Sequence, residues 1–162
     1  MKQPKEQLVA TEKRILTRSG RLQQVAALVY RRQKGSLQFL LITSRGSGRW
    51  VLPKGWPQVG RTLAETAICE AYEEAGVRGK ISREPIGSFN YTKADLPPER
   101  INQFSVAVFE MEFTSQEKNW PEKKERVCTW VSPQEAVLRV EEPDLKEILH
   151  RFGTPDIVVA AE

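Results

Sequence analysis

The 162-residue sequence contains few of the residue types on which several common sites depend. Its two cysteines, Cys69 and Cys128, are too few for a disulfide framework and lack the spacing of zinc ligands, so both are expected to be packed thiols. Its single histidine, His150, is not expected to act as a catalyst. The longest apolar run, Val25 to Tyr30, is far shorter than the roughly 18 residues of a membrane span. We therefore expect one cytoplasmic domain that does not enter a membrane.

Positive charge is concentrated near the N-terminus. The net charge is +4, but residues 1 to 35 hold nine Lys or Arg against two Glu, a balance of +7 that leaves −3 for the remainder. Such a segment suits attraction to a polyanion, such as a nucleotide, an inositol phosphate or RNA, and it equally suits a solvated surface arm. We favour the solvated arm, and a nucleic-acid partner is not expected because no aromatic-rich basic motif accompanies the charge.

The hydrophobic periodicity predicts a single α/β (α+β) domain. The runs that favour strands are residues 23–32, 36–45, 50–55, 80–91, 103–113 and 125–131, with a hairpin turn at 33–35. A long helix is predicted from the capping box of Thr62 and Glu65 to Gly76, and shorter helices over 136–140 and 142–152. This order indicates a mixed β-sheet flanked by helices. We expect a basic arm over residues 1–21, the domain over 22–153 and a C-terminal tail over 154–162, and the oligomeric state stays open.

Three glutamates stand out in the stretch GWPQVGRTLAETAICEAYEEAGV, residues 55 to 77. Glu70, Glu73 and Glu74 share one face of the predicted helix, because residues three and four apart are neighbours on a helix surface. Two carboxylates about 6 Å apart repel by about 3 kcal/mol at an effective dielectric constant of about 20, and the helix carries no basic residue. A divalent cation, a raised carboxylate pKa or hydration would relieve the repulsion. The stripe expected to be buried comprises Ala64, Ile68, Ala71, Tyr72 and Ala75.

This stretch resembles the Nudix box, in which a glycine, five residues, a glutamate and seven residues precede R-E-U-x-E-E-x-G-U, where U is bulky and aliphatic. The matching positions are Gly55, Glu70, Glu73, Glu74, Gly76 and Val77. The flanking segments GRWVLPKG and WPEKKERVCTWVSPQEAV are similar to the diphosphoinositol-polyphosphate-phosphohydrolase-like branch of the family, and the resemblance covers about residues 22 to 152. It implies a Nudix-type α/β/α sandwich.

The resemblance also implies a reaction. Nudix hydrolases cleave a pyrophosphate bond with Mg²⁺, or Mn²⁺, held by carboxylates and water. Carried over, it implies metal ligands at Glu70, Glu73, Glu74 and a main-chain carbonyl near Gly55. Glu70 and Glu73 are the expected catalytic residues, and Glu73 either shares the metal or serves as the base. The implied substrate is a small-molecule polyphosphate: a nucleoside diphosphate-linked compound, a dinucleoside polyphosphate or a diphosphoinositol polyphosphate.

Two charged positions of the motif have changed. Arg61 stands where the family has its first glutamate, Cys69 stands where it has the arginine, and Ala71 is small for an aliphatic position. The alternative interpretation is therefore a catalytically weak module that binds a phosphorylated ligand or RNA. Arg61 could supply part of the lost positive charge if its loop folds back over the acidic helix face.

Basic residues near the box are candidates for contacts with substrate phosphates through charge-assisted hydrogen bonds. The predicted substrate-binding residues are Arg45, Arg49, Lys54 and Arg61. Trp56 is expected to pack beside Pro57, and the alternatives are that it stacks on a base or lines the mouth of a pocket. The loop NYTKADLPPER, which contains Lys93 and Arg100, is a place where substrate choice could be encoded.

Overall fold

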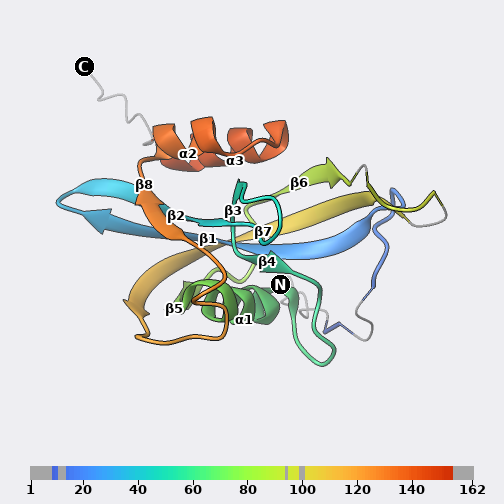
Figure 1. Cartoon of the computed structure of the whole chain (residues 1–162), viewed down its shortest axis with the longest axis horizontal. Coiled ribbons are helices and arrows are strands. Elements are labelled where there is room, and N and C mark those ends of the chain that lie inside the picture. The colour runs from blue at the N-terminus through green and yellow to red at the C-terminus, as the bar shows by residue number, and fades with distance from the viewer. Residues whose placement is uncertain (1–8, 11–13, 94, 99–100, 155–162) are drawn as a thin grey trace, which may run out of the picture.

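The computed structural model describes residues 9–10, 14–93, 95–98 and 101–154 (Figure 1). A mixed sheet lies between two helical layers, which confirms the predicted fold class. Helix α1 (Leu63–Ala75) covers one face of the sheet, and α2 (Pro133–Arg139) and α3 (Pro143–Gly153) cover the other. Most of the predicted basic arm, nearly all of the predicted tail and Arg100 lie outside the described residues. No helix in the described ranges is long and apolar enough to cross a membrane.

The described strands form one sheet. They are β1 (Leu22–Gln33), β2 (Ser36–Thr43), β3 (Trp50–Val51), β4 (Lys54–Gly55), β5 (Val77–Ile81), β6 (Gly87–Thr92), β7 (Gln103–Gln116) and β8 (Cys128–Val131). The main path is β3-β2-β1-β7-β5, while β4 pairs with β1, β6 with β7 and β8 with β2. The β1–β7 pair is parallel and the other pairs are antiparallel, so the sheet is mixed.

The apolar run in β1 is explained by burial on both faces of the sheet. Val25, Ala27 and Val29 belong to the core beneath α1, whereas Ala26 and Leu28 belong to the core beneath α2 and α3. A central strand covered on both sides reads as a continuous apolar run instead of an alternating one. The run therefore marks the middle of the sheet.

The β1–β2 hairpin turns at Lys34 and Gly35, inside the predicted turn. Both residues have positive φ, 51° and 80°, as in the two-residue turns whose twist matches that of the strands. Two other predicted strands are each divided. Residues 50–55 form β3 and β4, and residues 80–91 include the end of β5 and most of β6. Proline punctuates both segments, at Pro53 and Pro85, and it has no N–H to donate to a sheet.

Helix α1 begins and ends as predicted. The Thr62 hydroxyl accepts from the Glu65 N–H at 3.1 Å, and the Glu65 carboxylate accepts from the Thr62 N–H at 3.0 Å. Gly76 ends the helix at φ 69°, a left-handed conformation that favours glycine. A Cβ at Gly76 would also lie 2.3 Å from Cε3 of Trp120, so packing requires glycine as well.

The prediction of the buried stripe of α1 was partly wrong. Ile68 and Tyr72 are only half-buried, and the side chains that face the sheet are small, namely Ala64, Ala67, Ala71 and Ala75. Small side chains let the helix lie close to the sheet, which apolar character alone does not reveal. Tyr72 instead lies under the guanidinium of Arg78, 4.0 Å from its ring centre.

Candidate active site

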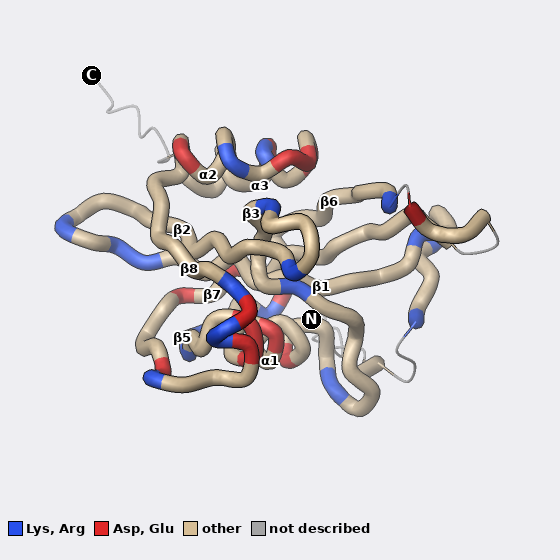
Figure 2. Tube along the Cα trace, viewed as in Figure 1, with Lys and Arg blue, Asp and Glu red and all other residues tan. Residues whose placement is uncertain are grey.

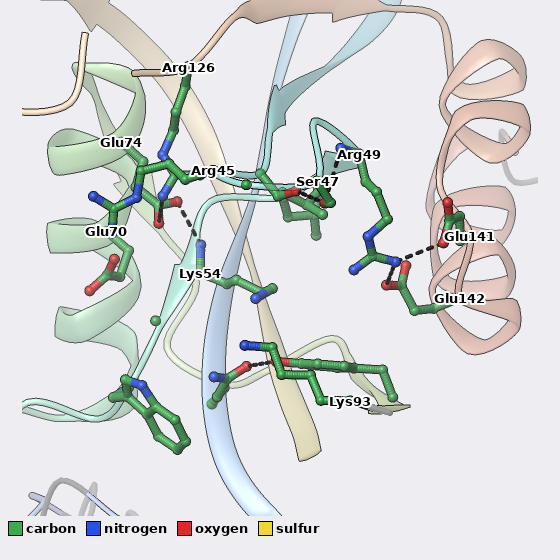
Figure 3. Close-up of a pocket in the computed structure, with 18 of the residues that line it drawn as sticks. Arg45, Ser47, Arg49, Lys54, Glu70, Glu74, Lys93, Arg126, Glu141 and Glu142 are labelled. Atoms are coloured by element: carbon green, nitrogen blue, oxygen red, sulfur yellow. Dashed lines mark hydrogen bonds and ion pairs between the residues drawn. The ribbon is translucent and has the colours of Figure 1, made fainter. Parts of the chain in front are cut away.

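A cavity of about 1390 Å³ opens between α1 and the start of α3 (Figure 3). The carboxylates of α1 form one side, and Arg49 with Glu141 and Glu142 forms the other. The predicted site residues that line this cavity are Gly55, Glu70, Glu73, Glu74, Arg45, Arg49 and Lys54. Figure 2 shows the acidic residues gathered along α1, with acidic and basic residues on the chain segment beside it. The fold thus brings most of the predicted site together.

Glu70 lies directly against the backbone of Gly55. A Cβ at Gly55 would be 2.4 Å from the carboxyl carbon of Glu70, so only glycine leaves room for this side chain. The amide of Gln58 donates to Glu70 Oε1 at 3.5 Å. Burial, followed by the negative charges of Glu74, Glu73 and Glu122, raises the pKa of Glu70 to about 8. Glu70 therefore lies where positive charge is lacking.

Glu74 is buried and held by two donors. Its Oε2 accepts from the Lys54 backbone N–H at 3.1 Å, and its Oε1 accepts from Nη2 of Arg126 at 3.1 Å. Burial nevertheless outweighs the effect of Arg126 and raises the pKa of Glu74 to about 7. Glu73, the third member of the cluster, is half-buried at the same wall of the cavity, and its carbonyl accepts from the Glu122 N–H at 3.0 Å.

Two residues of this site, Glu122 and Arg126, were missed in the sequence. Both lie in the segment between β7 and β8, and both line the cavity. Their stretch, WPEKKER, was identified as similar to the family, but nothing in it separates the buried Arg126 from the neighbouring lysines. Only the three-dimensional path of this segment, which returns to the C-terminal end of α1, brings them into the site.

The cations of the cavity differ in their partners. Arg49 forms ion pairs with Glu141 at 2.8 Å and Glu142 at 3.3 Å, and Arg45 lies 3.4 Å from Glu122. Lys54 forms no ion pair with any described residue, and burial lowers its pKa. In Figure 3 it lies between the α1 carboxylates and Arg49. Its Nζ lies 5.2 Å from the ring centre of Tyr91, so Lys54 offers an anionic ligand an ammonium group that no described carboxylate pairs with.

Aromatic rings line the cavity beside Lys54. Tyr91 stacks on Phe104 at a centroid distance of 4.9 Å and donates its hydroxyl to Gln24 at 2.6 Å. Trp56 packs edge-on against Phe104 at 5.8 Å and lines the cavity, as one of the alternatives for it had it. The cavity thus combines charged walls with an apolar edge.

Arg61 does not line the cavity, unlike the other three predicted substrate-binding residues. Its Nη1 donates to Sγ of Cys69 at 2.9 Å, so the two altered motif positions contact each other. Burial raises the pKa of the Cys69 thiol, although the positive charge of Arg61 opposes this effect. Arg61 is therefore directed to the helix face.

The N-terminal segment was expected to be a solvated arm, but part of it packs against the domain. Ala10 is buried, its N–H donates to the Arg61 carbonyl at 2.9 Å, and its carbonyl accepts from the Gly60 N–H at 2.8 Å. Further along, the guanidinium of Arg14 lies 5.5 Å from the ring centre of Trp56. These contacts attach the segment to the loop that leads from the cavity into α1.

The oxygen ligands expected at this site, the carboxylates of α1 and the Gly55 carbonyl, are of the type that binds a hard divalent cation. The carboxylate side chains are not gathered around one point. No three acidic, histidine or cysteine side chains within the described ranges form a ready metal site. However, carboxylate and carbonyl oxygens are the ligands that Mg²⁺ prefers, and it retains several waters. The raised pKa of Glu70 also marks a place that a cation would stabilise.

The structure thus defines an α/β/α sandwich with a carboxylate-lined cavity at the end of a helix. The family model described as NUDIX domain matches residues 20–152, so the chain belongs to the Nudix family. The predicted family is therefore confirmed.

The relatives include plant and human proteins. Nudix hydrolase 21, chloroplastic, from Arabidopsis thaliana is 31% identical over 139 residues, which make up 83% of this chain and 67% of that protein. Diphosphoinositol polyphosphate phosphohydrolase 3-alpha from Homo sapiens is 34% identical over 64 residues, 40% of this chain and 39% of that protein. The chain spans only about half to two thirds of the length of the plant relatives, from 51% to 67% for two of them.

Solved structures share the fold. The C. elegans Ap4A hydrolase aligns with a TM-score of 0.61 and 17% identity, covering 82% of this chain and 96% of that chain. The E. coli dihydroneopterin triphosphate pyrophosphohydrolase aligns with a TM-score of 0.61 and 13% identity, covering 81% and 94%. At these identities the likeness establishes the architecture only.

Proposed function

We propose that this chain is a Mg²⁺- or Mn²⁺-dependent pyrophosphohydrolase that acts on a small-molecule polyphosphate. The observation that carries the proposal is the division of one cavity into two walls. Glu70, Glu73 and Glu74 line the first, Arg49 lies on the wall opposite them, and Lys54 lies between the two walls. Cleavage of a pyrophosphate needs carboxylates that hold a cation and positive charges that hold phosphoryl oxygens, and this cavity offers both.

The residues take distinct parts in the proposed reaction. Glu70 and Glu74, with the main-chain carbonyl of Gly55, would hold the metal, and Glu73 shares it or accepts the proton of the attacking water. The bound metal supplies positive charge to the phosphoryl oxygens and activates water. Lys54 places its ammonium group beside the phosphates, where partial burial strengthens the attraction.

The substrate is proposed to be a nucleoside diphosphate-linked compound, a dinucleoside polyphosphate or a diphosphoinositol polyphosphate. The names of the human relative and of the C. elegans neighbour support the last two classes. A cavity of about 1390 Å³ is large enough for ligands of this kind. The cytoplasmic setting stays a prediction, because the curated relatives include proteins named chloroplastic and mitochondrial.

A second candidate function is a binding module without efficient hydrolysis. It is favoured by the contact between Arg61 and Cys69, which stand where the motif has a glutamate and an arginine. Such a module would use Lys54 and Arg49 to bind a phosphorylated ligand. An RNA ligand would depend on the basic N-terminal residues, of which Lys2, Lys5 and Lys13 lie outside the described ranges.

A metal-dependent release assay separates the two candidates. Full-length protein is incubated with and without Mg²⁺ or Mn²⁺ and a nucleotide sugar, diadenosine tetraphosphate or an inositol pyrophosphate, and released phosphate products are measured. We expect metal-dependent cleavage of at least one compound and a loss of at least about 100-fold in Glu70→Gln, which corresponds to about 3 kcal/mol of barrier. Glu147→Gln, on the exposed side of α3, is the matched control. Ligand binding by calorimetry without hydrolysis would instead support the binding module.

A further inference from the structure

Arg126 is a buried arginine whose position is set by the sheet. Its side chain is 8% exposed, and its Nη1 donates to the Thr43 carbonyl at the end of β2 at 3.0 Å. The backbone next to it is also fixed, because the Val127 N–H donates to the Thr43 hydroxyl at 2.9 Å and the Thr43 N–H donates to the Val127 carbonyl at 3.0 Å. Its guanidinium is therefore not a mobile surface group.

The same guanidinium joins two carboxylates of the cavity. Nη2 lies 3.1 Å from Glu74 Oε1 and 3.0 Å from Glu122 Oε1, and Nε donates to Glu122 at 3.3 Å. The Glu74 side chain is 7% exposed and that of Glu122 is 16% exposed. A planar fork of donors fixes both the distance and the orientation of the carboxylates that it binds.

Little else among the described residues can orient Glu74. Helix α1 contains no lysine or arginine, and Arg61 donates to Cys69. Lys54 reaches Glu74 through its backbone N–H, which holds Oε2 and leaves Oε1 to Arg126. The plane of the Glu74 carboxylate is thus defined by one donor from β4 and one from Arg126.

The segment that carries Arg126 is itself attached to the end of α1. The Glu122 N–H donates to the Glu73 carbonyl at 3.0 Å, and the Glu117 N–H donates to the Gly76 carbonyl at 2.8 Å. Trp120 lies between Glu117 and Glu122 in the chain, and its ring packs against Gly76. Arg126 is consequently held against the end of β2 and, through its own segment, against the end of α1.

We propose that Arg126 is a positioning residue that holds Glu74 and Glu122 on the same side of the cavity, in the orientation in which they take up a divalent cation. This inference rests on the proposed function. It assigns the ordering of the acidic cluster to a residue distant in the sequence instead of a basic residue on the helix. The opposing possibility is a plain counterion that competes with the metal for Glu74, and the two predict opposite changes in metal affinity.

The first test measures Mn²⁺ binding without substrate, from the electron paramagnetic resonance signal of free Mn²⁺. We expect Arg126→Gln to raise the Kd for Mn²⁺ at least tenfold and Arg126→Lys to give an intermediate value, because lysine keeps the charge and loses the fork. Arg139→Gln, which removes an ion pair on α2 outside the cavity, is the matched control and should match wild type. An unchanged or tighter Kd in Arg126→Gln overturns the proposal.

The second test asks whether Arg126 acts through Glu74. In a double-mutant cycle on Mn²⁺ binding, Arg126→Gln should change the Kd less than threefold once Glu74→Gln is present, whereas additive effects contradict a positioning role. Circular dichroism and thermal unfolding establish that each variant is folded, and Arg126→Lys carries the test if Arg126→Gln does not fold. If the wild type hydrolyses a compound and Arg126→Gln leaves the Kd for Mn²⁺ unchanged, this inference is contradicted and the proposed function stands. If the wild type binds Mn²⁺ but cleaves none of the compounds, the proposed function is contradicted and this inference stands.

Discussion

Replacing Gly55 by alanine adds one methyl group at the point where the backbone meets Glu70. The φ of Gly55 lies outside the left-handed region, so alanine can adopt the same backbone. The new Cβ would lie 2.4 Å from the Glu70 carboxyl carbon, whereas ordinary contact begins at 3.4 Å, so the carboxylate must move by about 1 Å. Because the clashing atoms end a flexible side chain, we expect a stability cost of only about 1 kcal/mol.

The effect on activity should be much larger than the effect on stability. A displacement of about 1 Å in a catalytic group can cost about 100-fold in rate, or about 2.7 kcal/mol of barrier. The assay is kcat for metal-dependent hydrolysis alongside the thermal unfolding midpoint. Glu70→Ala provides the background control, since Gly55→Ala should have almost no further effect on turnover once the carboxylate is gone. A Gly55→Ala variant with wild-type turnover would refute the placement of Glu70 in the site.

The remaining predictions concern charge and the N-terminal segment. Because the folded pKa of Glu70, about 8, exceeds its unfolded value of 4.5, the metal-free protein should lose stability as the pH rises from 4.5 to 8, and thermal unfolding of Glu70→Gln should show a smaller loss. An equal loss in both proteins would contradict the raised pKa. Cys69→Arg places a second cation against Arg61 and should lower the unfolding midpoint, while adding Arg61→Glu should restore it; additive effects in this cycle would rule out coupling. Deleting residues 1–10 removes the bonds between Ala10 and the 60–61 segment, so kcat should fall along with a rise in KM at low salt. A change confined to a salt-sensitive KM would indicate an electrostatic arm only.

Local signals in the sequence were sufficient for most of the fold. The capping box of Thr62 and Glu65 and the glycine at 76 depend on backbone groups within a few residues, and the structure reproduces them. The run over residues 23–32 was likewise predicted as a strand, and the structure has β1 there. Each of these features is determined by its own neighbourhood in the chain.

The sequence was less informative wherever distant segments meet. Spacing placed three glutamates on one helix face, but it could not identify Arg126 as the cation beside Glu74, because the pair forms only through the tertiary fold. The contact between Arg61 and Cys69 depends in the same way on the path of a loop. The incomplete burial of Ile68 follows from how closely an alanine stripe lets α1 approach the sheet, which hydrophobicity does not encode.

The separation of Arg126 from α1 has a consequence for folding during synthesis. Glu74 and Arg126 are 52 residues apart, and Arg126 lies two residues before the start of β8, which pairs with β2. Contacts between such distant segments form late, because the closure of a long loop must come first. A nascent chain that has emerged only to the end of α1 therefore carries three neighbouring glutamates without this counterion. The acidic cluster acquires its final arrangement only after the ribosome has released the segment that ends at β8.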